Sequence, residues 1–97
     1  MKRLSEERLR ALRNLIPIHE VIQHLELHAK VVEGYLRFLC PRCSEFHTAT
    51  NPRTNLARCF RCNVNYNPID LVMAVRNFSF LDVVQHLERH FSRYLPR

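Results

Sequence analysis

Residues 40–62 read CPRCSEFHTATNPRTNLARCFRC, and this stretch decides the fold. It contains the 4 cysteines of the chain, arranged as two Cys-x2-Cys pairs. The chain turns tightly at a Cys-x2-Cys pair, and this turn places the two thiolates on one side of the loop. Two of these loops on adjoining hairpins supply the corners of a tetrahedral zinc site, with Zn–S bonds of about 2.3 Å. We therefore predict one structural Zn²⁺, held by Cys40, Cys43, Cys59 and Cys62.

Other interpretations of the cysteines are two disulfides, a thiol redox pair, or a site in which His47 replaces one cysteine. Disulfides belong to oxidising compartments, whereas residues 1–14 alternate charged residues with leucine and lack the apolar stretch of a signal peptide. A redox Cys-x2-Cys normally occurs singly in a βαβ unit. Zinc is therefore favoured, and a metal with four thiolates has no open position for water.

Length and hydropathy limit the class of protein. The 97 residues fit one domain, residues 1–97, whose small core would gain materially from a metal ion. No apolar run approaches the roughly 18 residues of a transmembrane helix. Together with the N-terminal pattern, this predicts a cytoplasmic protein.

The pattern of apolar and capping residues predicts an α+β fold, in which a zinc ribbon of about three short antiparallel strands is flanked by N- and C-terminal helices. Ser5, Asn67 and Ser79 stand at expected helix starts. The expected elements are helices over about 4–15 and 18–27, a ribbon over about 34–66 with strands at 34–40, 47–50 and 56–60, and helices over about 68–77 and 79–92. The buried stripe of the last helix is expected to be Leu81, Val84, Leu87 and Phe91.

Positive charge is concentrated in the ribbon. The formal net charge is +6 and the pI about 9.7; residues 34–66 carry five arginines against Glu45 alone, whereas the segments on either side are nearly balanced. This distribution favours an acidic partner such as nucleic acid, although small soluble domains also carry stray basic surpluses. Aromatic rings can stack on unpaired bases. The predicted nucleic-acid-binding residues are Arg37, Arg42, Arg53, Arg58, Arg61, Tyr35, Phe60 and Tyr66.

Some ribbon aromatics must fill the interior instead. Strand alternation places Tyr35 and Arg37 on one face of their strand, and Arg58 and Phe60 on one face of theirs. Phe38 is expected in the core. Phe46 is expected there too.

Histidines recur in two similar octapeptides, residues 21–28 and 83–90. Each carries a histidine pair with i,i+4 spacing, which could grip a metal on one helix. The pairs are His24/His28 and His86/His90. The sequence suggests no carboxylate or third ligand, so solvated or capping histidines are expected.

Two knuckles, CPRC at residues 40–43 and CFRC at 59–62, are followed by IDLVM at 69–73 and FSFLDVV at 78–84. With these segments the chain resembles the zinc-binding domain of bacterial DnaG-type primases, the Cys-His-Cys-Cys family. Cys43 stands where that family usually has histidine. The resemblance implies a zinc ribbon that handles template DNA. Because the chain ends where a primase continues into its polymerase domain, it also implies a stand-alone module.

Two functions of different classes are consistent with these features. The first is a single-stranded DNA-binding module, accessory to primer synthesis or to mobile-element or phage replication, whose protein partner is a separately encoded primase, polymerase or helicase. The second is a zinc-ribbon protein-interaction adaptor without direct DNA contact. Acidic residues are thinly spread, so no catalytic residue is expected, and neither a membrane nor a small-molecule substrate is an expected partner.

Overall fold

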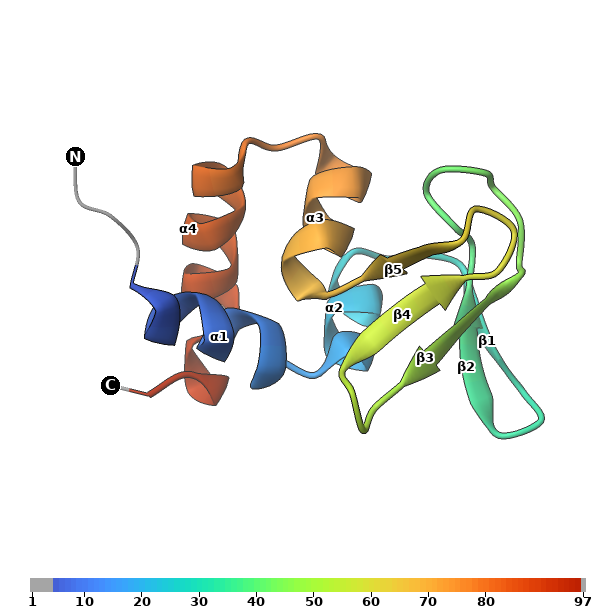
Figure 1. Cartoon of the computed structure of the whole chain (residues 1–97), viewed down its shortest axis with the longest axis horizontal. Coiled ribbons are helices and arrows are strands. Elements are labelled where there is room, and N and C mark those ends of the chain that lie inside the picture. Colours follow the sequence, from blue (N-terminus) through green and yellow to red (C-terminus); the bar gives the residue numbers. More distant parts are fainter. Residues whose placement is uncertain (1–4, 97) are drawn as a thin grey trace.

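The computed structural model describes residues 5–96, so Leu4, the predicted start of the first helix, lies outside the described residues. This part of the chain has the predicted α+β fold, with four α-helices and two small antiparallel sheets. The helices gather at one end of a molecule of 41 × 24 × 21 Å and the strands at the other (Figure 1). In chain order the elements are α1 (Glu6–Asn14), α2 (Ile18–His24), β1 (Ala29–Val32), β2 (Tyr35–Phe38), β3 (Thr48–Asn51), β4 (Leu56–Cys59), β5 (Val64–Tyr66), α3 (Pro68–Arg76), α4 (Phe80–His90) and the 3-10 turn η1 (Ser92–Tyr94).

Side-chain caps fix the starts of three helices, as predicted. The Ser5 hydroxyl accepts the N–H of Arg8, and the Ser79 hydroxyl accepts the N–H of Asp82. Asn67 and Asp70 form a reciprocal capping box at the start of α3. These local bonds satisfy N–H groups that have no partner inside a helix.

The sheets contain two strands more than predicted. β1 pairs with β2, through a two-residue turn in which Glu33 (φ 53°) and Gly34 (φ 83°) both have positive φ, as a type I′ loop requires. β5 has only three residues and pairs with β4, where Cys59 lies opposite Val64. Both extra strands are short, and they are defined by the partners to which they bond rather than by their own apolar pattern.

The two sheets are joined through one side chain. The hydroxyl of buried Thr48 in β3 accepts the N–H of Phe38 in β2 at 2.8 Å and donates to the carbonyl of the same residue. This pair of bonds replaces the ladder that would otherwise connect β2 with β3. The two sheets are therefore held together in one strand-containing end of the molecule.

The core lies between the helices and the inner face of the three-stranded sheet. Phe38 is fully buried, as predicted, but Phe46 is only partly buried and lies under the ammonium group of Lys30, so its assignment to the core is wrong. Leu81 is 48% exposed and is also a wrong assignment. At about 100° per residue it lies roughly 60° outside the arc that carries the buried residues of α4. That arc contains Val83, Val84, Leu87 and Phe91.

The chain turns in left-handed conformations with little help from glycine. It contains one glycine, yet six other residues have positive φ in the part of the chain that the structure describes. They are Glu26, Glu33, Ser44, Asn55, Asn63 and Asn77. Glu26 ends α2 in a Schellman motif, because its N–H bonds to the Gln23 carbonyl and the next N–H, of Leu27, bonds to Ile22. Among the described residues, no helix is long and apolar enough to cross a bilayer.

Candidate metal centre

The four cysteines come together at one end of the three-stranded sheet. Cys40 and Cys43 lie in the connection from β2 to β3, Cys59 is the last residue of β4, and Cys62 lies in the turn to β5. Their sulfur atoms all lie within 4.8 Å of one another. The connection and the turn lie side by side, away from the β1–β2 and β3–β4 turns (Figure 1). We call the region of the cysteine-bearing connection and turn the metal end, and the region of the β1–β2 and β3–β4 turns the turn end.

The sulfur spacing fits a metal centre. The Cys43 and Cys59 sulfurs are 3.6 Å apart, and all four cysteines are free. Two sulfurs bonded to one tetrahedral zinc at 2.3 Å would be about 3.8 Å apart, whereas the sulfurs of a disulfide are about 2.05 Å apart. His47, the alternative ligand, is exposed and does not belong to this group. The four cysteines are thus placed to bind one metal ion.

Hydrogen bonds shape the knuckles and point donors at the sulfurs. The N–H of Arg42 lies 3.4 Å from the Cys40 sulfur, and the N–H of Cys62 lies 3.4 Å from the Cys59 sulfur. Asn63 follows the second knuckle with φ 56°, a left-handed conformation that asparagine tolerates better than most residues. Donors of this kind favour the thiolate form that binds metal.

The thiols titrate unequally. Burial raises the pKa of Cys40, but hydrogen bonds from the Tyr66 hydroxyl and the backbone outweigh it and lower that pKa to about 6. Burial and the neighbouring thiols raise the pKa of Cys62 to about 12. Ionisation of one thiol therefore disfavours ionisation of the next. A divalent cation among the four sulfurs would offset that repulsion with its positive charge, and its binding would release the remaining thiol protons.

The predicted nucleic-acid-binding residues do not form one surface. Arg42 and Arg61 lie within the knuckles at the metal end, and both are exposed. Phe60, also there, is 57% exposed. In contrast, Tyr35 and Arg53 lie at the turn end, about 10 Å away along strands that rise 3.3 Å per residue.

Tyr66 differs from the other aromatics on the predicted list. It is 6% exposed, and its hydroxyl lies 3.5 Å from the Cys40 sulfur. The ring is therefore packed under the metal centre and is not offered to a base. Tyr66 pairs with Ala57 on the inner face of the sheet, and this pairing between distant residues is not visible in the sequence.

Arg58 and Arg37 have distinct surroundings. The Arg58 guanidinium lies over the Phe60 ring, 5.8 Å from its centroid, and donates to the Asn65 side chain at 3.2 Å. The three residues share the outer face of β4 and β5. Arg37 in β2 is partly buried, and its Nε is a buried nitrogen without a hydrogen-bond partner among the described residues.

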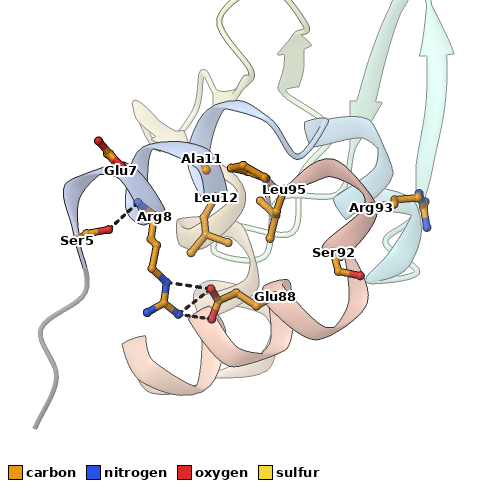
Figure 2. A pocket seen from close by; sticks show the side chains of 10 residues that line it. Ser5, Glu7, Arg8, Ala11, Leu12, Glu88, Ser92, Arg93 and Leu95 are labelled. Atoms are coloured by element: carbon orange, nitrogen blue, oxygen red, sulfur yellow. Dashed lines mark hydrogen bonds and ion pairs between the residues drawn. The ribbon is translucent and has the colours of Figure 1, made fainter.

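A separate hollow of about 850 Å³ lies between α1, α4 and η1 (Figure 2). Its wall includes the bidentate ion pair between Arg8 and Glu88, with a shortest N–O distance of 2.6 Å. Among residues 5–96, no cysteine or histidine lines it. It contains none of the predicted site residues, so the metal end remains the candidate site.

Comparison with known proteins adds no further assignment. A scan against protein-family models finds no match to this chain, and neither does a search of curated proteins. The class that the fold and site define is a small α+β domain with a possible four-cysteine metal site.

Proposed function

We propose that this chain is a zinc-dependent nucleic-acid-binding module that binds single-stranded DNA, as an accessory to primer synthesis or to mobile-element or phage replication. The observation that carries the proposal is the group of arginines and an exposed aromatic ring around the four-cysteine cluster. Arg42, Arg58, Arg61 and Phe60 form this group, which we call the metal-end patch. Its protein partner would be a separately encoded primase, polymerase or helicase.

Zinc is the metal that best suits the site. Four thiolates at tetrahedral spacing are the ligand set of structural zinc. Such a site is closed, so the ion would hold the two knuckles together without activating water. The resemblance of the knuckles to those of primase zinc-binding domains supports the same choice.

Single-stranded DNA suits the chemistry of the metal-end patch. Arginines supply contacts to phosphates, and an exposed ring can stack an unpaired base for about 1–3 kcal/mol. The cation–π contact with Arg58 holds the Phe60 ring in place while leaving it 57% exposed. A paired base has no free face for such stacking, so a duplex should bind more weakly.

The test is a titration of the zinc-loaded protein with labelled single-stranded DNA at several salt concentrations. We expect affinity to fall as salt rises, because cations are released from the DNA. Arg37→Ala, Arg58→Ala and Arg61→Ala should each weaken binding and reduce the slope of log affinity against log salt by about 0.7.

Arg93→Ala is the matched control, since Arg93 is an exposed arginine in η1, far along the chain from the ribbon. It should leave both affinity and slope unchanged. Equal effects of all four substitutions, or no binding at low salt, would contradict the proposal.

The second candidate is a protein-interaction adaptor. It is favoured by apolar side chains around the start of α4, where Phe78, Phe80 and Leu81 are 36%, 40% and 48% exposed. Phe80→Ser with Leu81→Ser would then weaken capture of a replication protein while leaving DNA affinity intact. If the arginine substitutions have no effect on DNA and this pair removes partner binding, the adaptor is the better description.

A further inference from the structure

Three histidines from distant parts of the sequence meet at the helical end of the molecule. His24 is the last residue of α2, while His86 and His90 lie one turn apart on α4. One ring nitrogen from each of the three lies within 4.8 Å of those from the other two. His24 and His86 are thus partly buried in a cluster rather than freely solvated, whereas His90 is exposed, as expected of a solvated histidine. Residues 83–90 supply only two ligands, His86 and His90. The third ligand, His24, comes from the other octapeptide, residues 21–28.

The spacing of the nitrogens approaches that of a metal centre. The Nε2 atoms of His24 and His86 are 2.9 Å apart. Two imidazole nitrogens bonded to one tetrahedral ion at 2.0–2.1 Å would be about 3.3 Å apart. For His24 and His86, a shift of a few tenths of an ångström would thus exchange the hydrogen bond between the rings for two bonds to an ion.

Packing holds the rings on two rigid elements. The ring centroids of His86 and His90 are 4.4 Å apart, and His24 lies 4.9 Å from His90. Phe91 packs edge-on against His24 at 5.1 Å, and Phe78 packs against His86 at 5.7 Å. His24 and His86 are partly buried, while His90 is exposed and gives an ion access from solvent.

The charges around the cluster are mixed. Burial, the neighbouring His90 and Arg76 lower the pKa of both His24 and His86, whereas Glu26 acts in the opposite direction on His24. Neutral imidazoles keep the lone pair that a metal needs. The nearby arginines reduce the attraction for a cation, so binding should be weaker than at the four-cysteine cluster.

We propose that His24, His86 and His90 form a second metal site, specific for imidazole-preferring divalent ions such as Zn²⁺, with solvent in the remaining position. Three imidazoles with one open position suit Zn²⁺, Ni²⁺ or Cu²⁺ far better than Mg²⁺ or Ca²⁺. Because the ligands come from α2 and α4, the ion would link these two helices. This site is independent of the four-cysteine cluster and of DNA binding.

The experiment uses the full chain already loaded with one equivalent of zinc, and Co²⁺ as the probe. Further Co²⁺ should bind at one additional equivalent and give visible d–d absorption without the near-ultraviolet charge-transfer band of cobalt thiolates. A melting scan in excess Zn²⁺ should show a higher Tm than in one equivalent, since an ion that binds the folded state stabilises it.

His90→Ala removes the exposed ligand with the least disturbance of packing, and His86→Ala removes a second one. Each should weaken the additional equivalent by more than about tenfold and abolish the extra rise in Tm, with the first zinc retained. His28→Ala and His19→Ala are the controls, because both histidines are exposed and lie outside the cluster. Stoichiometry of one in the wild type, cobalt–thiolate absorption for the second ion, or its survival in His86→Ala with His90→Ala would overturn the proposal.

Discussion

The Asn55 side chain joins the strand-containing end of the molecule to the helical end. It lies in the turn between β3 and β4 with φ 58° and is 8% exposed. Its carbonyl oxygen accepts the N–H of Ile18 at 2.8 Å, and its amide donates to the carbonyls of Arg13 and Ile16, each at 2.7 Å. The Asn55 side chain thus caps α2, because the N-cap residue of that helix, Pro17, makes no side-chain capping hydrogen bond.

We expect Asn55→Ala to lower the free energy of unfolding by about 2–4 kcal/mol. The substitution leaves a buried N–H and buried carbonyls without partners, and it places alanine in a left-handed conformation. Urea denaturation of the zinc-loaded protein measures the change. Asn51→Ala is the control, since the Asn51 side chain accepts an exposed N–H, from Arg53; a similar loss there would contradict the role given to Asn55.

The sequence indicates the turn at Asn55 but not its bonds to the end of α1, the start of α2 and Ile16 between them. The same limit applies to the three clustered histidines and to Tyr66. In each case the decisive contact joins residues far apart in the chain, which neither spacing nor periodicity encodes. The four cysteines were predictable because their ligand geometry is written in two local turns.

At the scale of the elements, we expect the ribbon to depend on a metal ion bound by the four cysteines. Its strands have three or four residues each, and small sheets of this kind have little stability alone. Cys59 is buried in the last position of β4, opposite both Thr48 and Val64. It therefore belongs at once to the metal centre and to the sheet.

We expect Cys59→Ser, or removal of metal with a chelator, to unfold the ribbon while leaving part of the helical signal. The four thiols would lose the ion that links two otherwise separate loops. Amide NMR spectra should show loss of dispersion for residues 35–66, and elemental analysis should fall from one zinc equivalent to none. Ser44→Ala, in the same connection but without a ligand atom in the cluster, should keep both; full retention of zinc and dispersion in Cys59→Ser would contradict the assignment.

Helix positions were more predictable than strand positions. The caps at Ser5, Asn67 and Ser79 are local, so the structure reproduces them at the expected residues. β1 and β5 exist because β2 and β4 offer edges for pairing, and no alternation within three or four residues could reveal that. The error at Leu81 has another cause. The spacing of Val84, Leu87 and Phe91 indicates a helix, but it does not fix the edges of the arc that the helix buries.

At the scale of the whole molecule, we propose that the chain catalyses nothing alone and acts in primer synthesis only together with a polymerase. Nucleotidyl transfer needs carboxylates that hold two divalent ions, and the ribbon contains only Glu45. The isolated chain, incubated with Mg²⁺ or Mn²⁺, nucleotides and single-stranded template, should yield no primers. A mock preparation of Cys59→Ser is the control for contaminating polymerase; products present with the wild type alone would contradict the expectation.

The left-handed turns leave room for improvement in thermal tolerance. Glu26 ends α2 at the position of a Schellman motif that glycine usually occupies, and there its side chain crowds the backbone. Glu26→Gly should therefore raise the free energy of unfolding by about 1 kcal/mol, whereas Arg10→Gly, at an exposed position in the middle of α1, should lower it by about as much. Thermal melts of the two variants would compare them directly. A protein that builds its turns from glutamate, serine and asparagine gains a stiffer unfolded chain but stores conformational strain, which protein engineering could release one turn at a time.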